Sequence, residues 1–276
     1  MANFENSTVR GFAMHDKNGI TYMTVPAVDA CGHFHHGFMT RRGGVSSGVY
    51  ASLNLSMTRE GNPQNRKENY RLACEALGID PEDLVLVNYE HGDGICEITP
   101  ADRGKGFDIP TDLPKCDALV VEGPGVTAVT MHADCTPVFC VDRTGSRGGI
   151  CHSGWKGTVR RLPQKLAAYL IKKGSRPEDL LIGIGPHIRS CCFEVGEEVA
   201  EIFRDEFGEQ TIQERRGEKS WISLENALLA QLAALGLDPG QITVAEECTS
   251  CREDLFYSHR RDHGNTGAMG AFLAIR

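Results

Sequence analysis

A thiol and an imidazole stand close together in a glycine-rich part of the chain. Cys135 lies in the segment Met131-His-Ala-Asp-Cys-Thr-Pro-Val138, and His152 lies in Cys151-His-Ser-Gly-Trp-Lys-Gly157. Soft and borderline ligands of this kind suit Zn²⁺ or a copper ion. The same two side chains could instead act as a nucleophile and its general base. The residue types alone leave both uses open.

A third candidate ligand follows a short apolar run. His91 lies in Asn88-Tyr-Glu-His-Gly-Asp-Gly94, directly after the run Leu84–Val87. Cys135 and His152 also stand at the ends of predicted strands, and side chains at neighbouring strand ends can meet although they are far apart in the chain. Three protein ligands leave a tetrahedral ion one open position for water or substrate, which is the arrangement of a catalytic zinc site.

Two neighbours of Cys135 admit more than one interpretation. His132 precedes it with a His-x-x-Cys spacing that could bind a metal directly, place the ring behind a ligand as a base, or point it elsewhere. Asp134 could orient a histidine ring, but capping of a turn is its expected role.

The other cysteines and the N-terminal residues bear on the cellular compartment and on whether disulfides form. The chain has 276 residues and 11 cysteines. Its start, MANFENSTVRGF, lacks the charged-then-apolar layout of a signal peptide, so we expect a cytoplasmic protein without disulfides. Cys140 and Cys151 fall in apolar runs and should be small buried residues. The Cys248-x-x-Cys251 pair suggests a redox or structural-zinc motif, but no second pair is expected to accompany it.

The charge balance excludes some partners. The formal net charge is −8, whereas a surface that binds nucleic-acid phosphates normally carries an excess of Lys and Arg. The basic pairs Arg41-Arg42 and Arg260-Arg261 could still hold one small anion. No apolar run approaches the ~20 residues needed to cross a bilayer. We therefore expect neither nucleic acid nor a membrane as a partner, and the sequence leaves the oligomeric state undefined.

Four stretches have the period and end signals of helices. Asn62 precedes the first as a cap, and Ser223 precedes the last. Pro163 must lie in the opening turn of the second helix, or that helix begins later than its pattern suggests. The predicted helices are Pro63–Leu77, Val159–Lys173, Gly196–Phe207 and Leu224–Leu235.

Short β-rich runs lie between these helices, and Glu122-Gly-Pro-Gly125 predicts a hairpin turn between two of them. Because the strands cluster in pairs and do not alternate strictly with helices, the predicted fold class is α+β. No repeat or long linker interrupts the chain, so we expect a single domain over residues 1–276. The predicted strands are Leu84–Val87, Ala118–Val121, Val126–Met131, Pro137–Val141, Leu180–Ile184 and Ile242–Val244.

An ordered set of motifs from His36 to the C-terminus resembles one known family. On these motifs the chain resembles the bacterial YfiH-like proteins, also called the laccase-domain or multi-copper polyphenol oxidase family and described as purine nucleoside phosphorylases. The motifs are His36-Gly-Phe-Met-Thr-Arg-Arg-Gly-Gly-Val-Ser46, Ser52-Leu-Asn-Leu-Ser56, Ala133-Asp-Cys-Thr-Pro-Val138, His152-Ser-Gly-Trp-Lys-Gly157, Gly185-Pro-His-Ile188, Cys192-Phe-Glu-Val-Gly196 and Ser258-His-Arg-Arg-Asp262.

The resemblance implies a fold, a cofactor and a set of site residues. The fold would be mixed β-sheets packed as a sandwich and flanked by helices. The metal ligands would be His91, Cys135 and His152, with zinc as the expected ion and copper as the alternative; Cys135 and His152 would also be catalytic. Arg41, in the Thr-Arg-x-Gly-Gly motif, would be a catalytic and substrate-binding residue, and Asn54 would contact substrate.

The resemblance also implies a reaction, with rivals. The expected activity is zinc-dependent phosphorolysis of adenosine, inosine and methylthioadenosine, with purine nucleoside and phosphate as partners and adenosine deamination as a further activity. One rival is a cysteine-type amide hydrolase that edits peptidoglycan precursors, with Cys135 as nucleophile and His152 as base. Another is a copper polyphenol oxidase, although His33-Phe-His35-His36 is the sole histidine-rich run. The last is a structural zinc protein whose shell His132 would close.

The chain departs from the family pattern at several positions. Tyr89 replaces the usual Gln, Lys156 and Ala268 each replace an Arg, and His132 replaces a small hydroxyl residue. These departures leave the three ligand positions intact and bear on substrate choice. The adjacent Cys191-Cys192 matches a family position, and its expected role is packing beneath the site.

Overall fold

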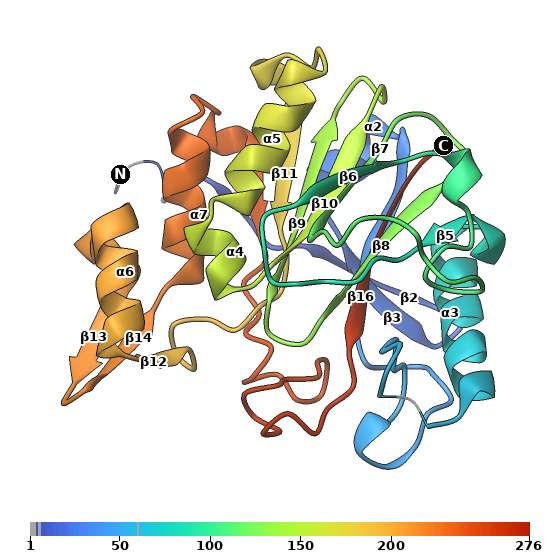
Figure 1. Ribbon diagram of the computed structural model, residues 1–276, viewed down its shortest axis with the longest axis horizontal. Helices are drawn as coiled ribbons and strands as arrows, with labels where there is room; N and C mark the ends of the chain where they lie inside the picture. The colour runs from blue at the N-terminus through green and yellow to red at the C-terminus, as the bar shows by residue number, and fades with distance from the viewer. Residues whose placement is uncertain (1–3, 5–6, 60) are drawn as a thin grey trace.

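Two large β-sheets lie face to face, and helices cover their outer faces (Figure 1). The computed structural model describes residues 4, 7–59 and 61–276. The seven-stranded sheet contains, in spatial order, β1 (Val9–Arg10), β15 (Ile242–Val244), β11 (Leu180–Ile184), β9 (Thr136–Asp142), β10 (Gly148–Ser153), β7 (Ala118–Val121) and β6 (Ile95–Ile98). The six-stranded sheet contains β2 (Ala13–Lys17), β3 (Ile20–Thr24), β4 (Phe34–Met39), β16 (Met269–Ile275), β8 (Thr127–His132) and β5 (Leu84–Val85).

Alternation along the strands builds the layers. In β7, Leu119 and Val121 join the apolar core between the two sheets, whereas Ala118 and Val120 join the core under the helices, as a two-residue side-chain period requires. Helices α5 (Leu162–Lys172) and α7 (Leu224–Ala233) cover the seven-stranded sheet, and α3 (Pro63–Leu77) covers the six-stranded sheet. Both sheets mix parallel and antiparallel pairs. The fold is therefore α+β, as the strand grouping predicts.

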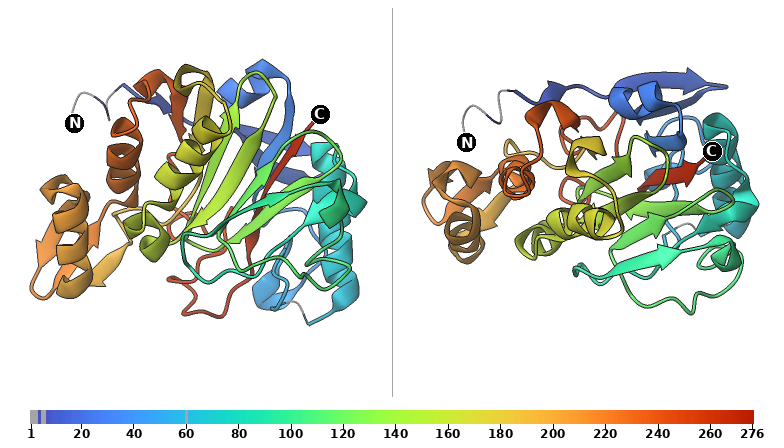
Figure 2. Two further views of the ribbon diagram at one scale, coloured as in Figure 1. Left: turned by 45° about the horizontal axis from the view of Figure 1, so that its top comes forward. Right: turned by 90° about the horizontal axis from the view of Figure 1, so that it is seen from above.

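A small third sheet stands at one end of the molecule. Its strands, β12 (Glu194–Gly196), β14 (Lys219–Ile222) and β13 (Ile212–Arg216), pack with α6 (Glu197–Phe207). Figure 2 shows this orange unit apart from the two large sheets in both views. A short helix, α2 (Pro26–Cys31), follows β3.

The helix predictions agree with the structure because they depend on local end signals. Helix α3 has the predicted bounds, and the Asn62 side chain accepts a hydrogen bond from the backbone N–H of Gln64. The second predicted helix begins later than its pattern suggested: α4 (Trp155–Val159) ends where it was expected to start, and α5 begins at Leu162 because Arg161 takes a left-handed conformation with φ of 63°. Pro163 therefore lies in the opening turn of α5.

The predicted hairpin at Glu122–Gly125 is wrong. Strand β7 pairs with β10 and β6 in one sheet, whereas β8 pairs with β16 and β5 in the other. Turn residues show where the chain reverses but not which strand edges bond, and both strands here are almost wholly buried. The turn therefore carries the chain from one sheet to the other, and the chain crosses back between β8 and β9.

Two expectations from the sequence concern a membrane-spanning helix and an export signal. None of the helices that the described ranges contain is long and apolar enough to cross a membrane. Residues 1–3, 5 and 6, within the N-terminal segment considered for an export signal, lie outside the described residues.

Candidate metal centre

The backbone brings three candidate ligands to one edge of the sandwich. Cys135 lies in the crossing from β8 to β9, directly before the pairing of Thr136 with Ser153. His152 is the neighbour of Ser153 near the end of β10 and pairs with Pro137. His91 lies in the turn between β5 and β6, where its φ of 55° lets the chain bend back towards β10.

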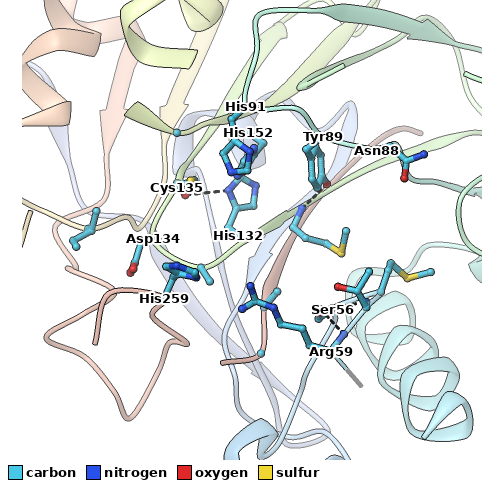
Figure 3. A pocket seen from close by; sticks show the side chains of 18 of the residues that line it. Ser56, Arg59, Asn88, Tyr89, His91, His132, Asp134, Cys135, His152 and His259 are labelled. Carbon is cyan, nitrogen blue, oxygen red and sulfur yellow. Dashed lines mark hydrogen bonds between the residues drawn. The ribbon is translucent and has the colours of Figure 1, made fainter. Parts of the chain in front are cut away.

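The ligand atoms of His91, Cys135 and His152 all lie within 4.8 Å of one another. Figure 3 shows the two rings and the sulfur facing a common point at one side of a pocket. Ligand atoms around a tetrahedral zinc ion are roughly 3.3–3.8 Å apart, given bond lengths near 2.0–2.3 Å. The spacing therefore suits one cation held by two nitrogens and one sulfur, with its fourth side towards the cavity.

A single buried carboxylate, Asp117, positions both histidines. Its Oδ1 lies 3.1 Å from Nδ1 of His152, and its oxygens accept backbone N–H groups of His91 at 3.2 Å and Gly92 at 2.8 Å. Burial would raise the pKa of Asp117, but the His152 ring and the backbone N–H groups of Gly92 and Glu90 lower it below its usual value. The carboxylate fixes the tautomer of His152, so that Nε2 is the nitrogen available to a metal. Sequence reasoning missed Asp117.

The charges at the site form a thiolate–imidazolium pair when no metal is bound. Burial would raise the pKa of Cys135, but the rings of His152 and His91 lower it to about 6. Burial would lower the pKa of His152, but Cys135 and Asp117 raise it to about 9. A metal ligand must also be a thiolate, so the same environment prepares Cys135 for either use.

His132 lies behind the ligands and not among them. Its Nε2 lies 2.8 Å from Oγ1 of Thr130, and its Nδ1 lies 3.1 Å from the carbonyl oxygen of Cys135. Both ring nitrogens thus have partners, and the ring packs 5.2 Å from that of His152. Burial holds its pKa well below 6.5, so the ring is neutral. This geometry disfavours a closed zinc shell completed by His132.

Asp134 ties three loops together. Its carboxylate accepts hydrogen bonds from the Thr249 hydroxyl and from the backbone N–H of Arg260, each at 2.7 Å, and its carbonyl accepts the N–H of Ile188 at 3.0 Å. No histidine contact is recorded for this carboxylate among the described residues. The expected turn-capping role is therefore closer to the structure than the orienting role.

The cavity beside the three ligands has a volume of about 590 Å³, within the range of small-molecule sites. Apolar side chains form much of its wall, and two arginines and a further histidine provide polar groups away from the three ligands. The apolar residues are Met57, Leu86, Val87, Met131, Trp155, Ile188, Phe193 and Leu224. The added polar residues are Arg59, Arg260 and His259. Figure 3 shows Arg59 near Ser56, on the other side of the pocket from Cys135, and His259 near Asp134.

Arg41 and Asn54 are not where the sequence analysis expected them. Neither is among the described residues that line the cavity. The Arg41 guanidinium donates to the carbonyls of Ala51 and Glu253 and stacks on the Tyr257 ring at 4.4 Å. These contacts occupy the guanidinium with partners other than the residues that line the cavity.

Asn54 supports the pocket from beneath. It is fully buried, and its Oδ1 accepts the backbone N–H groups of Ser56 and Ala268, each at 3.0 Å. Ser56 and Ala268 both line the cavity. Asn54 thus positions the two segments that meet there, a role that the sequence motif did not indicate.

The other family departures have distinct outcomes. The Tyr89 hydroxyl accepts the N–H of Met131 at 2.7 Å, and its ring lies 4.8 Å from that of His152, so it steadies a ligand from the side. Lys156 is exposed, with its ammonium 5.6 Å from the Trp155 ring.

The histidine-rich run proposed for a copper oxidase does not join a candidate metal site. The histidines of the His33–His36 run belong to neither group of side chains that could hold a metal ion in the described part of the chain.

The comparisons with known proteins identify the family. A family described as multi-copper polyphenol oxidoreductase laccase matches residues 35–276. The chain belongs to this family. A protein of Deinococcus radiodurans named purine nucleoside phosphorylase is 36% identical over 240 residues, covering 87% of this chain and 88% of that protein. A protein named adenosine deaminase RL5, from an unknown prokaryotic organism, is 30% identical and covers 83% and 90%.

A solved structure shares the same fold. The crystal structure of YlmD from Geobacillus stearothermophilus matches with a TM-score of 0.88 and 31% identity, covering 96% of this chain and 98% of that one. The family resemblance stated from the sequence motifs is thereby confirmed, and with it the α+β fold.

Proposed function

We propose that this chain is a zinc-dependent purine nucleoside phosphorylase that acts on adenosine, inosine and methylthioadenosine. The observation that carries the proposal is the meeting of His91, Cys135 and His152, oriented by Asp117, at the wall of a cavity of about 590 Å³. The names of relatives that align over most of the chain support the choice of substrate.

The donor set fits zinc. Two imidazoles and one thiolate suit this borderline ion, and a buried carboxylate behind one histidine is the usual partner of a zinc ligand. When bound there, Zn²⁺ would supply a Lewis acid at the cavity wall or lower the pKa of a bound water towards ~7. Three protein ligands would leave the fourth position open to substrate.

The remaining walls suit a nucleoside and an anion. Trp155 and Phe193 provide apolar surface for a purine ring. Arg59 and Arg260 bring planar, permanently charged donors, which bind phosphate well. In phosphorolysis a phosphate oxygen forms a bond to C1′ of the ribose, the C1′–N9 bond breaks, and the purine takes up a proton. The chain's own part is to hold both substrates in line and to offset the charge of the phosphate.

The proposal is tested by incubating zinc-loaded protein with inosine or adenosine in the presence of phosphate. Release of hypoxanthine or adenine together with ribose 1-phosphate is expected, and Cys135→Ala should abolish it. Metal analysis of protein purified without added metal separates zinc from copper. If the native protein releases no more base than the Cys135→Ala control, the proposal is wrong.

Adenosine deamination is a second activity of the same site, suggested by the relative named adenosine deaminase RL5. Here water replaces the 6-amino group, so adenosine and water give inosine and ammonia without phosphate. Omitting phosphate from the assay distinguishes the two reactions, because only deamination continues. Inosine formation that persists in Cys135→Ala protein would count against this activity.

One observation favours a different function. The lowered pKa of Cys135 and the raised pKa of His152 describe a thiolate–imidazolium pair, which is the nucleophile and base of a cysteine-type amide hydrolase. Peptidoglycan precursors would be its substrates. A chelator should leave such an enzyme active, whereas it should inactivate a zinc-dependent phosphorylase. Thiol alkylation inactivates both, so chelation is the deciding measurement.

A further inference from the structure

A second cluster of cysteines lies away from the candidate metal centre. The sulfur atoms of Cys191, Cys192, Cys248 and Cys251 all lie within 4.8 Å of one another. The Cys248-x-x-Cys251 pair therefore does have a partner pair, contrary to the sequence analysis. The partner was missed because its two cysteines are adjacent in sequence and do not repeat the spacing. Cys191 and Cys192 were expected to pack beneath the site, and this is wrong for Cys191, which is exposed.

Two loops at the ends of parallel strands form the cluster. Cys191 and Cys192 follow β11, and Cys248 and Cys251 follow β15, which pairs with β11. The pairing continues beyond the strands through a bridge between His187 and Cys248. The sheet itself thus brings the two loops together.

The separations fit a metal better than a disulfide. The Cys251 sulfur lies 3.4 Å from that of Cys192 and 3.6 Å from that of Cys191, and all four residues are free cysteines. A disulfide requires about 2.05 Å between sulfurs. Four thiolates bound to one zinc ion at 2.3 Å lie about 3.8 Å apart along each edge of the tetrahedron. The four sulfurs already stand near these positions.

Hydrogen-bond donors and positively charged groups lie around the cluster. Cys248 is buried, and its sulfur accepts the backbone N–H of Arg189 at 3.4 Å. Two guanidinium groups lie on the same loops: Arg260 donates to the Cys192 carbonyl and Arg261 to the Ser250 carbonyl, each at 3.3 Å. Their positive charges offset the negative charge of a tetrathiolate site.

We propose that Cys191, Cys192, Cys248 and Cys251 form a second metal site that binds one zinc ion through four thiolates. Because the protein supplies all four ligands, no position remains for substrate and the role is structural.

The ion braces one wall of the cavity. Ile188, Phe193 and Arg260 line the cavity and flank the cluster or bond to its loops, and Asp134 binds Ile188, Thr249 and Arg260. The second site thus fixes the loops that contact the segment carrying Cys135.

The test counts zinc per chain and uses no activity. Protein purified under reducing conditions should contain two zinc ions. Cys135→Ala should retain one, Cys248→Ser should retain one, and the double variant should retain none. Cys31→Ser is the matched control, since this half-buried thiol donates to the Val28 carbonyl and its loss should leave both ions. One zinc in native protein and none in Cys135→Ala would overturn the proposal.

A second measurement avoids reliance on a variant of the cluster. Cys135→Ala protein, stripped of metal and kept reduced, is titrated with Co²⁺ or Zn²⁺. A thiolate-to-cobalt charge-transfer band should appear at one equivalent, and zinc should protect the four cluster cysteines from alkylation as read by mass spectrometry. Absence of both the band and the protection would overturn the proposal. A disulfide between Cys251 and either Cys191 or Cys192 in freshly purified protein would do so too.

Discussion

The Asp117 carboxylate holds both histidines of the candidate metal centre in place. It accepts hydrogen bonds from Nδ1 of His152 and from the backbone N–H groups of His91 and Gly92. Asp117→Asn keeps the shape but loses the charge that raises the pKa of His152. We expect zinc affinity to fall by about 10–100-fold, the usual cost of losing such a partner, as measured by competition with a chelator.

The control for this change is Asp93→Asn. Asp93 lies in the same turn but pairs with Lys165 near the surface, so its substitution should leave zinc affinity within experimental error. Equal affinities for the native protein and Asp117→Asn would show that the carboxylate does not support the metal.

Cys135 should be unusually reactive in metal-free protein. The His152 and His91 rings outweigh burial and lower its pKa to about 6, against about 8.5 for an ordinary thiol. Since the thiolate is the nucleophile, the alkylation rate should rise with pH and reach half its maximum near pH 6. Site-resolved mass spectrometry measures the rate. Zinc should suppress it, and Cys140, which is buried with a raised pKa, should stay unmodified. A midpoint near pH 8.5 would contradict the pairing with His152.

At the residue scale, the sequence predicts which side chains could bind a metal better than it predicts the residues that orient them. Cys135, His91 and His152 could be proposed because thiols and imidazoles are side chains that bind zinc and because the family motifs single out these three positions. Asp117 precedes the apolar strand β7 and looks like any strand-start carboxylate, since its partners come from a distant loop. Arg41 shows the converse: a motif fixes the position of a side chain in the chain but not the direction in which it points.

At the element scale, the start of α4 sets the space available to the sulfur. Gly154 precedes this helix, and a Cβ there would stand 3.0 Å from the Cys135 sulfur and 3.3 Å from Cδ2 of His91. Its φ of −71° suits any residue, so Gly154→Ala should displace the ligands with little backbone strain. We expect weaker zinc binding, measured by calorimetry, with a nearly unchanged melting temperature of the metal-free protein.

Gly61→Ala is the control for the glycine substitution. A Cβ at Gly61 meets no atom of the described residues within 4 Å, so this change should leave zinc binding as it is. If Gly154→Ala binds zinc as tightly as the native protein, the sulfur and the ring do not need the space that the glycine leaves.

Elements were predictable where local chemistry defines them. Helix α3 has a cap, a proline and a glycine stop within its own sequence, and its bounds follow. Strand β16 was not predicted: its run Met-Gly-Ala-Phe-Leu-Ala-Ile is wholly buried and has no polar alternation, and Gly and Ala, which are depleted in strands, hold three of its seven positions. Sheet membership also escaped prediction, because the partners of β8 lie far away in the chain.

At the scale of the whole molecule, the candidate metal centre draws its residues from separate parts of the sandwich. Cys135 lies where the chain passes between the sheets, His152 lies in the seven-stranded sheet, and His91 lies in a loop that leaves the six-stranded sheet. The cysteine cluster joins two more loops. Metal bound at either site should therefore resist separation of these parts, and its effect should be seen in global unfolding.

Zinc should raise the free energy of unfolding by an amount set by its dissociation constant and its free concentration. A ligand that binds only the folded state adds about 4 kcal/mol when its free concentration is a thousand times its dissociation constant. We expect the free energy of unfolding of the reduced, metal-free protein, measured with urea, to rise by about this amount for each site that zinc occupies. Mg²⁺, which prefers oxygen ligands, should have no effect. Cys135→Ala should lose one part of the gain and Cys248→Ser another. A gain that survives in the double variant would mean that zinc stabilises the protein elsewhere.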